Sequence, residues 1–196
     1  MLYIHIKLKI MKKLSAIILF SLFALTANAQ IEKGKVQVSG SFNISSIEVN
    51  GIETNRFDLT PQAGYFLSDN ISLGVVLGYQ SAGNSNAKDK LFSFGVFSRF
   101  YKPIADRFYF FAQPQIAFGT GETAAEADIS AFSIGIRPGF SYFLSDKISM
   151  DMSVQGFNYE NREEGANERT FTGFSLNPNT VNVGVSFLFK PRRKTA

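Results

Sequence analysis

Cysteine and tryptophan are absent from this chain, and histidine occurs once, as His5. Without cysteine there is no disulfide, no thiol nucleophile and no residue to carry a lipid anchor. A hydroxyl nucleophile normally relies on an imidazole base, and metal sites commonly use imidazole or thiolate ligands. The paired acids Glu163-Glu164 fall in a segment that has neither. These absences argue against an enzyme and against a metal or other cofactor.

No apolar run reaches the roughly 18 to 20 residues that a membrane-spanning helix needs. The longest, Leu14 to Leu25, follows the basic Met11-Lys12-Lys13 and precedes Ala27-Asn28-Ala29. A basic region, a short apolar region and a small-x-small site are the pattern of a cleavable secretory signal peptide. We therefore expect residues 1–29 to be a signal peptide, with Met11 as the alternative start of the chain.

An excess of positive charge is also missing once that segment is removed. The sequence has 20 basic and 16 acidic residues, but four of the lysines fall within residues 1–29. The remainder is formally neutral, so nucleic-acid binding loses its main support. Basic residues gather only in residues 190–196, which also contain Pro191 and read as a basic, unstructured tail.

What the chain does contain is period-two alternation of apolar and polar residues. It fills eight segments of roughly nine to twelve residues: 36–45, 57–65, 71–80, 92–100, 108–119, 131–142, 148–155 and 181–189. Short turns, such as Ser68-Asp69-Asn70, follow the second, fourth and sixth segments. Longer polar stretches follow the others, and the charged segment 160–169 is the longest loop candidate. A bulge near Asn177-Pro178-Asn179 would restore the register before the last segment.

The two faces of these strands differ in kind. One is large and apolar, and the other is mostly Gly, Ser, Gln, Asn and Thr with few charges. A soluble barrel turns its apolar face inward and its polar face to water, whereas small and amide side chains suit a narrow lumen. Aromatic residues gather beside the short turns, as in the belts of membrane barrels: Tyr65, Phe66, Tyr101, Phe108, Tyr142, Phe143, Phe187 and Phe189.

The even strand number and the alternation of short turns with long loops complete the fold prediction. A transmembrane strand needs about 9 to 11 residues, and membrane barrels have short periplasmic turns and long outer loops. The sequence predicts an all-β protein, an eight-stranded antiparallel up-and-down transmembrane β-barrel over residues 30–189. Both termini are then periplasmic.

The last strand carries a further pattern. From Asn182, glycine follows at Gly184 and aromatic residues at Phe187 and Phe189. This resembles the terminal-strand signal read by the outer-membrane assembly machinery, except that residues 190–196 follow it. With the signal peptide and the strands, the chain resembles small outer-membrane barrels of the OmpX, OmpA-barrel and opacity-protein type. The resemblance implies the outer membrane of a Gram-negative bacterium, with its lipid bilayer and the assembly machinery as partners.

Four charged residues fall on the small, polar face: Asp58, Arg99, Arg137 and Asp151. Counted from the turn at Ser145-Asp146, Arg137 and Asp151 come out as near-diagonal neighbours on adjacent strands. One interpretation is an ion-pair and amide network that fills the lumen; the other is a gate or selectivity ring in a narrow channel. Eight strands leave an interior barely wide enough for side chains, which favours the filled lumen.

Three functional classes follow from these observations. The leading hypothesis is a non-enzymatic outer-membrane barrel that acts through its extracellular loops or in envelope integrity. The small outer-membrane barrels that are enzymes resemble one another in using a catalytic histidine, and His5 lies in the segment expected to be removed. The alternative is a small-solute porin, and the third class is a soluble periplasmic or secreted binding barrel.

Overall fold

The computed structural model describes residues 31–49, 52–84, 87–176 and 181–191. The expected signal peptide and the expected bulge at Asn177-Pro178-Asn179 lie outside these residues, as does most of the basic tail. In the part of the chain that is described, no helix is long and apolar enough to cross a membrane.

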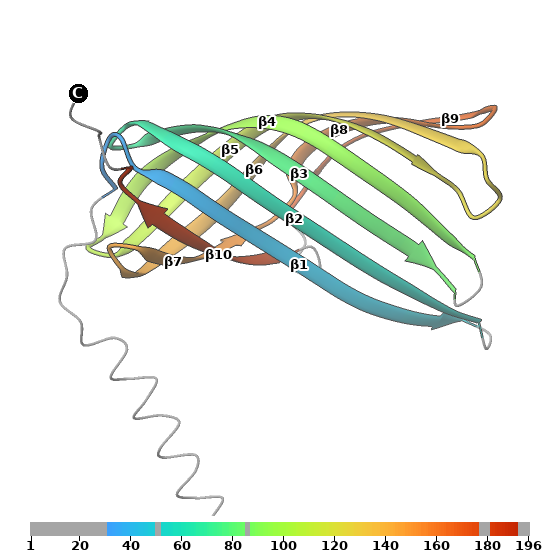
Figure 1. Ribbon diagram of the computed structural model, residues 1–196, viewed down its shortest axis with the longest axis horizontal. Helices are drawn as coiled ribbons and strands as arrows, with labels where there is room; N and C mark the ends of the chain where they lie inside the picture. Colours follow the sequence, from blue (N-terminus) through green and yellow to red (C-terminus); the bar gives the residue numbers. More distant parts are fainter. Residues whose placement is uncertain (1–30, 50–51, 85–86, 177–180, 192–196) are drawn as a thin grey trace, which may run out of the picture.

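The described strands pair antiparallel in one sheet that closes on itself (Figure 1). They are β1 (Val36–Val49), β2 (Ile52–Ser68), β3 (Ile71–Gly83), β4 (Lys88–Ala105), β5 (Phe108–Glu122), β6 (Asp128–Ser145), β7 (Ile148–Ser153), β8 (Gly156–Glu164), β9 (Asn167–Ser175) and β10 (Asn182–Phe189). β7 and β8 both pair with β6, so together they form one wall strand, and β9 with β10 forms the next. Pairing of β5 with β6 closes the ring. The predicted eight-stranded up-and-down barrel is confirmed.

The barrel has two unlike ends. Tight turns gather at one of them, which we call the turn end; they lie at residues 69–70, 106–107 and 146–147. Both described chain ends lie here too (Figure 1). The Gly34 amide donates to the Phe66 carbonyl (2.9 Å) and the Leu188 amide to the Lys147 carbonyl (2.7 Å). At the opposite end, which we call the loop end, β8 turns into β9.

The strands run further toward the loop end than the sequence pattern predicted. Against an expected nine to twelve residues, β2, β4 and β6 have 17, 18 and 18. The prediction of a loop over residues 160–169 is wrong: β8 ends at Glu164, β9 begins at Asn167, and Glu163 pairs with Glu168 across the hairpin. Because main-chain hydrogen bonds hold the ladder, polar side chains on both faces do not end a strand.

The last two wall strands change face partway along. Met152 is outward on β7 and Phe157 is outward on β8, an odd number of residues apart. The break falls at Gly156, whose φ of +63° is a left-handed conformation that glycine adopts at little steric cost. On the neighbouring wall strand Phe174 and Val183 are both outward. The bulge predicted near residues 177–179, between these two, lies outside the described residues.

Toward the loop end no pairing joins β1 to β9 among the described residues, and residues 177–180, between β9 and β10, lie outside them. β1 pairs with β10 only from Val36 to Ser41, and among the described strands β9 pairs only with β8. Residues 42–49 of β1 thus have β2 on one side and no described strand on the other. We call this edge of β1, residues 42–49, the seam. Figure 1 shows β1 and β9 on separate sides of the loop end.

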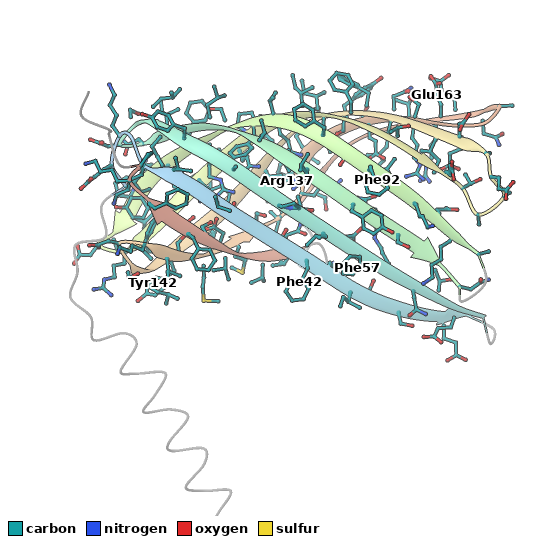
Figure 2. The ribbon with its side chains drawn as sticks, viewed as in Figure 1. Phe42, Phe57, Phe92, Arg137, Tyr142 and Glu163 are labelled. Atoms are coloured by element: carbon teal, nitrogen blue, oxygen red, sulfur yellow. The ribbon has the colours of Figure 1, made fainter. Side chains whose placement is uncertain are left out.

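The large apolar face points outward all along the wall. Leu73 and Leu77 on β3 are each 51% exposed, whereas Ser72 and Val76 between them are buried against the lumen. This is the reverse of a soluble barrel, in which apolar side chains form the core. Figure 2 shows outward side chains along the length of the barrel.

Aromatic residues near the short turns divide between two environments, where the sequence analysis had assigned them to one belt. Tyr65 and Phe187 are about half exposed on the outside, at 46% and 53%. Phe66, Tyr101 and Phe143 are buried inside the barrel. Adjacent residues of a strand point to opposite faces, so Tyr65 and Phe66 cannot both lie in a belt.

Candidate functional site

Seven buried side chains form one cluster inside the lumen at the turn end. We call them the plug: Ile31, Phe66, Tyr101, Tyr109, Phe111, Phe143 and Leu188. The Tyr101 ring centroid lies 5.6 Å from that of Phe66 and 6.0 Å from that of Phe111, both in tilted contact. Such pairs contribute about 0.5–1.5 kcal/mol beyond the area they bury. Ile31 belongs to the plug because the chain before β1 folds over the turn end, where the Lys33 amide donates to Asp69 Oδ1 (2.8 Å).

Glycines on the inner face make room for the large rings. A Cβ at Gly74 would collide with the Phe97 ring, and one at Gly139 would collide with the Phe111 ring. A barrel this narrow accommodates large rings only where the facing wall carries no side chain. The small residues noted in the sequence are therefore the counterpart of the buried rings.

A polar layer crosses the lumen beside the plug, centred on the buried carboxylate of Asp151. This group accepts hydrogen bonds from Arg99 Nη1 (2.7 Å) and from the hydroxyls of Ser141 (2.8 Å), Ser149 (3.1 Å) and Ser186 (2.8 Å). A buried ion pair is tolerated when further hydrogen bonds satisfy the remaining lone pairs. The three serine hydroxyls meet that condition here.

Arg99 carries the polar layer across the barrel. Its Nε donates to Gln113 Oε1 (2.7 Å), its Nη1 also donates to the Tyr101 hydroxyl (3.2 Å), and its guanidinium carbon lies 4.2 Å from the Phe111 ring centroid. The Tyr101 hydroxyl in turn donates to Gln37 Oε1 (3.0 Å). We call the whole set the lumen network: Gln37, Gln62, Arg99, Tyr101, Gln113, Gln115, Ser141, Ser149, Asp151 and Ser186.

The four charged residues predicted for the lumen are not joined into one network. Arg99 and Asp151 bond across the barrel, from β4 to β7, although the sequence analysis gave Asp151 to Arg137 on the adjacent strand. Asp58 bonds instead to Arg56 on its own strand, with Nε and Oδ2 2.9 Å apart. Among the described residues Arg137 makes no hydrogen bond and no ion pair, and it borders two lumen cavities. The partner of Asp151 is the arginine whose side chain extends across the lumen to it. Counting residues from a turn compares only adjacent strands and cannot identify that partner.

Side chains fill only the turn-end half of the lumen. Beyond the network lies a cavity of about 610 Å³, whose polar lining includes Asn43, Arg137 and Glu160. It adjoins a second cavity of about 430 Å³ nearer the loop end, bordered by Arg169 and Phe171. We call the two together the loop-end cavity. Figure 2 places Arg137 about halfway along the barrel.

The loop-end cavity was not predicted from the sequence, although a signal for it was present. Small inward residues line its wall: Gly78, Ser93, Ala117, Gly119, Ser133 and Gly135. The space beside a small inward residue can be filled or empty. Next to a large ring such as Phe97 the ring fills it, and elsewhere it remains as a cavity. Which outcome holds depends on strands far apart in the sequence.

The four residues of the expected assembly signal divide between the two faces of β10. Asn182 and Gly184 border a cavity of about 30 Å³ in the lumen. Phe187 and Phe189 are about half exposed on the outer face. The pattern therefore presents two aromatic rings outward at the turn end and keeps its polar and glycine positions inside.

Comparison with protein families agrees with this fold. A family model described as an outer membrane protein beta-barrel domain matches residues 15–189. Among solved structures, the chain is similar to Neisserial surface protein A at 17% identity, with 80% of this chain and 98% of that chain covered and a TM-score of 0.49. It is also similar to the N-terminal β-barrel domain of Pseudomonas aeruginosa OprF at 14% identity, with 80% and 98% covered and a TM-score of 0.43. No curated protein sequence matches it.

Proposed function

We propose that this chain, which belongs to the outer-membrane protein β-barrel domain family, is a non-enzymatic barrel with a closed lumen that acts at its loop end or in envelope integrity. Membership of the family implies that the protein is embedded in the outer-membrane bilayer of a Gram-negative bacterium. The observation that carries the proposal is the plug, together with the lumen network beside it.

A small-solute porin would need a continuous water path, and the turn-end half offers obstacles to one. A solute would have to displace buried rings such as Phe111 and separate Arg99 from Asp151. Leaving one member of a buried ion pair without its partner costs about 3–5 kcal/mol. This cost supports a closed barrel over the channel alternative.

The loop end supports the other half of the proposal. Beyond the ring contacts of Tyr79 with Phe92 and of Phe132 with Tyr159, the wall continues as strands with exposed polar side chains. The β8–β9 hairpin carries charge on both faces, including the bonded pair Arg162–Glu164. Side chains of this kind suit water and lipid headgroups, so the hairpin is the part of the barrel suited to contact the cell exterior.

Conductance in a planar bilayer tests the closed lumen. We expect no steady openings from the full mature protein. A variant with Phe66→Ala and Phe111→Ala, which removes two plug rings, is the matched control and should open at least intermittently. Steady openings of the unaltered protein would overturn the closed-lumen reading.

The role of the loop end is tested separately in cells. A chain in which residues 160–171 are replaced by a short turn retains the plug and the network, so it should still reach the outer membrane. We expect it to resemble a deletion strain in its uptake of a hydrophobic dye. If the deletion strain and the strain with the replaced hairpin both take up as much dye as the unaltered strain, the result counts against a role in envelope integrity.

A further inference from the structure

We propose that the loop-end cavity binds a short peptide with free termini, with the peptide's carboxylate at Arg137 and its ammonium group at Glu160. The inference goes beyond the proposed function and does not depend on it. A peptide can be held at these two residues whether or not solutes pass the turn end.

Two opposite charges of the larger cavity lack a partner. The charged residues that border this cavity are Arg56, Asp58, Arg137, Glu160 and Arg162. Arg56 is bonded to Asp58, and Arg162 is bonded to Glu164. Among the described residues, Arg137 and Glu160 make no hydrogen bond and no ion pair. One guanidinium and one carboxylate are therefore left for a ligand.

An amide side chain lies between these two charges. Asn158 on β8 is two residues from Glu160, and its pairing partner on β6, Gly135, is two residues from Arg137. All four residues border the larger cavity. A Cβ at Gly135 would lie 2.9 Å from Asn158 Oδ1, so the Asn158 side chain lies over the glycine. Like its charged neighbours, it makes no hydrogen bond among the described residues. A carboxylate, an amide and a guanidinium thus follow one another along the inner wall.

This order matches the polar groups of an extended peptide. Glu160 is paired with Ser133, four residues from Arg137 along β6, which is about 13 Å at roughly 3.3 Å per residue. An extended tripeptide spans about 10 Å, and the two long side chains can cover the difference. The Asn158 amide can donate to a peptide carbonyl and accept from a peptide N–H. The Arg137 guanidinium suits a terminal carboxylate, which it can bind through two parallel hydrogen bonds.

The cavity has room for such a ligand and a route to it. Its volume of about 610 Å³ falls within the range of roughly 300–1,000 Å³ that is usual for small-molecule sites. The second cavity is also bordered by Glu160 and continues to Asn167, the first residue of β9 at the hairpin. A peptide can therefore enter from the loop end.

Other ligands satisfy fewer of these groups. An inorganic anion would pair with Arg137 and leave Glu160 without a cation, and a polyamine would do the reverse. A neutral sugar could bond to Asn158 but would pair with neither charge. A zwitterion pairs with both charges, and the amide between them favours a peptide over a single amino acid.

Because the chain contains no tryptophan, Phe171→Trp provides a single fluorescent reporter. Phe171 is paired with Glu160 across the β8–β9 hairpin and borders the second cavity. The matched control is Phe174→Trp, three residues further along β9 and exposed on the outer face. We would titrate the full mature protein in neutral micelles with trialanine. We expect a saturable fluorescence change at position 171 and none at position 174.

Capped peptides test each charge without a further change to the protein. N-acetyl-trialanine lacks the ammonium group, and trialanine amide lacks the carboxylate. Each should bind about tenfold more weakly than trialanine, as expected for the loss of one charged hydrogen-bond partner.

Variants of the reporter protein then assign each end of the peptide to a residue. Arg137→Gln should bind trialanine and its amide equally and still prefer the free ammonium group. Glu160→Gln should show the reverse preference. Glu163→Gln, exposed on β8, and Arg107→Gln, in a tight turn at the turn end, are the matched controls and should keep the original affinity. Circular dichroism checks that each variant retains its β-structure.

Three results would overturn the proposal: no saturable change at position 171, an equal change at position 174, or capped peptides that bind as tightly as trialanine. A variant at Arg137 or Glu160 that keeps both end preferences would overturn the assignment of that end. Acetate or methylammonium competing as strongly as the peptide would show a site for a single ion, and would also overturn the proposal. Steady conductance would sink the proposed function without affecting this binding test.

Discussion

A single carboxylate, Asp151, holds together side chains from four wall strands. It accepts hydrogen bonds from residues on β4, β6, β7 and β10. In a confined lumen such a group is costly unless it is paired, because desolvation opposes the charge. Its strength as a cross-link therefore depends on Arg99 remaining in place.

We predict that Arg99→Gln lowers the free energy of unfolding by about 3–5 kcal/mol, because it leaves Asp151 charged and buried. Asp151→Asn should cost a similar amount by leaving Arg99 unpaired. The double variant should recover part of the loss, which unfolding by urea in lipid vesicles would measure. Arg137→Gln is the matched control and should cost less, since Arg137 does not bond Asp151 in the structure. Strictly additive losses for Arg99 and Asp151 would contradict the coupling.

At this scale the sequence predicted which face a residue occupies but not which partner it meets. Period two is a local property, so the inward direction of Arg99 and Asp151 could be read from their own strands. Their contact joins β4 to β7, which are not neighbours in the sheet. The contact exists because the barrel closes and brings these strands to opposite sides of a narrow lumen. Counting residues along one hairpin cannot predict it.

At the scale of elements, the interruption between β7 and β8 depends on one glycine. Gly156 has φ +63°, and a Cβ there would collide with the Ile136 carbonyl of the adjacent strand. Gly165, in the β8–β9 turn, has φ +58°, but a Cβ there would lie no nearer than 3.5 Å to a neighbour, the Ala127 methyl, which is an ordinary contact. Both positions have a strained backbone for any residue other than glycine, but only Gly156 also lacks room for a side chain.

We predict that Gly156→Ala destabilises the barrel more than Gly165→Ala. Both substitutions incur about 1–2 kcal/mol for a left-handed alanine, and only the first adds the collision with the wall. Thermal unfolding in the same micelles compares them directly. Equal losses would mean that the wall yields freely at Gly156.

The terminal strand makes a prediction about assembly. Phe189 and Phe94 are both outward and about half exposed, at 49% and 53%, so replacing either by alanine should have a similar effect on lipid contact. If β10 carries the signal that the assembly machinery reads, Phe189→Ala should lower the amount of protein in the outer membrane far more than Phe94→Ala. Quantitative blotting of outer-membrane fractions measures this, and equal amounts would count against the signal.

Strand lengths show where a sequence pattern misleads at this scale. Residues 81–90, 120–128 and 160–169 are polar on both faces, and the sequence analysis took them for loops. In the structure β3, β4, β5, β6, β8 and β9 run into or through them. Polar side chains on both faces indicate that both sides of the wall are exposed to water. They do not show where the strand ends, because main-chain groups form the hydrogen bonds of the ladder.

At the scale of the whole molecule, the two ends of the barrel differ. The turn end holds the plug and both described chain ends, whereas the loop end holds the cavity and a charged hairpin. The outward apolar band between them suits a bilayer. Each end of such a barrel faces a fixed side of the membrane only if the protein always inserts in the same orientation.

We predict that the loop end faces the cell exterior and the turn end the periplasm. Membrane barrels carry short turns on the periplasmic side, and here the short turns and both chain ends share one end of the barrel. The absence of cysteine allows a direct measurement. Ala166→Cys, exposed in the β8–β9 turn, should react on intact cells with a maleimide too large and charged to cross the outer membrane. Asp146→Cys, also exposed and in a short turn, should react only after the cells are opened. Labelling of position 146 but not 166 on intact cells would reverse the assigned orientation, and with it the side from which the loop-end cavity is reached.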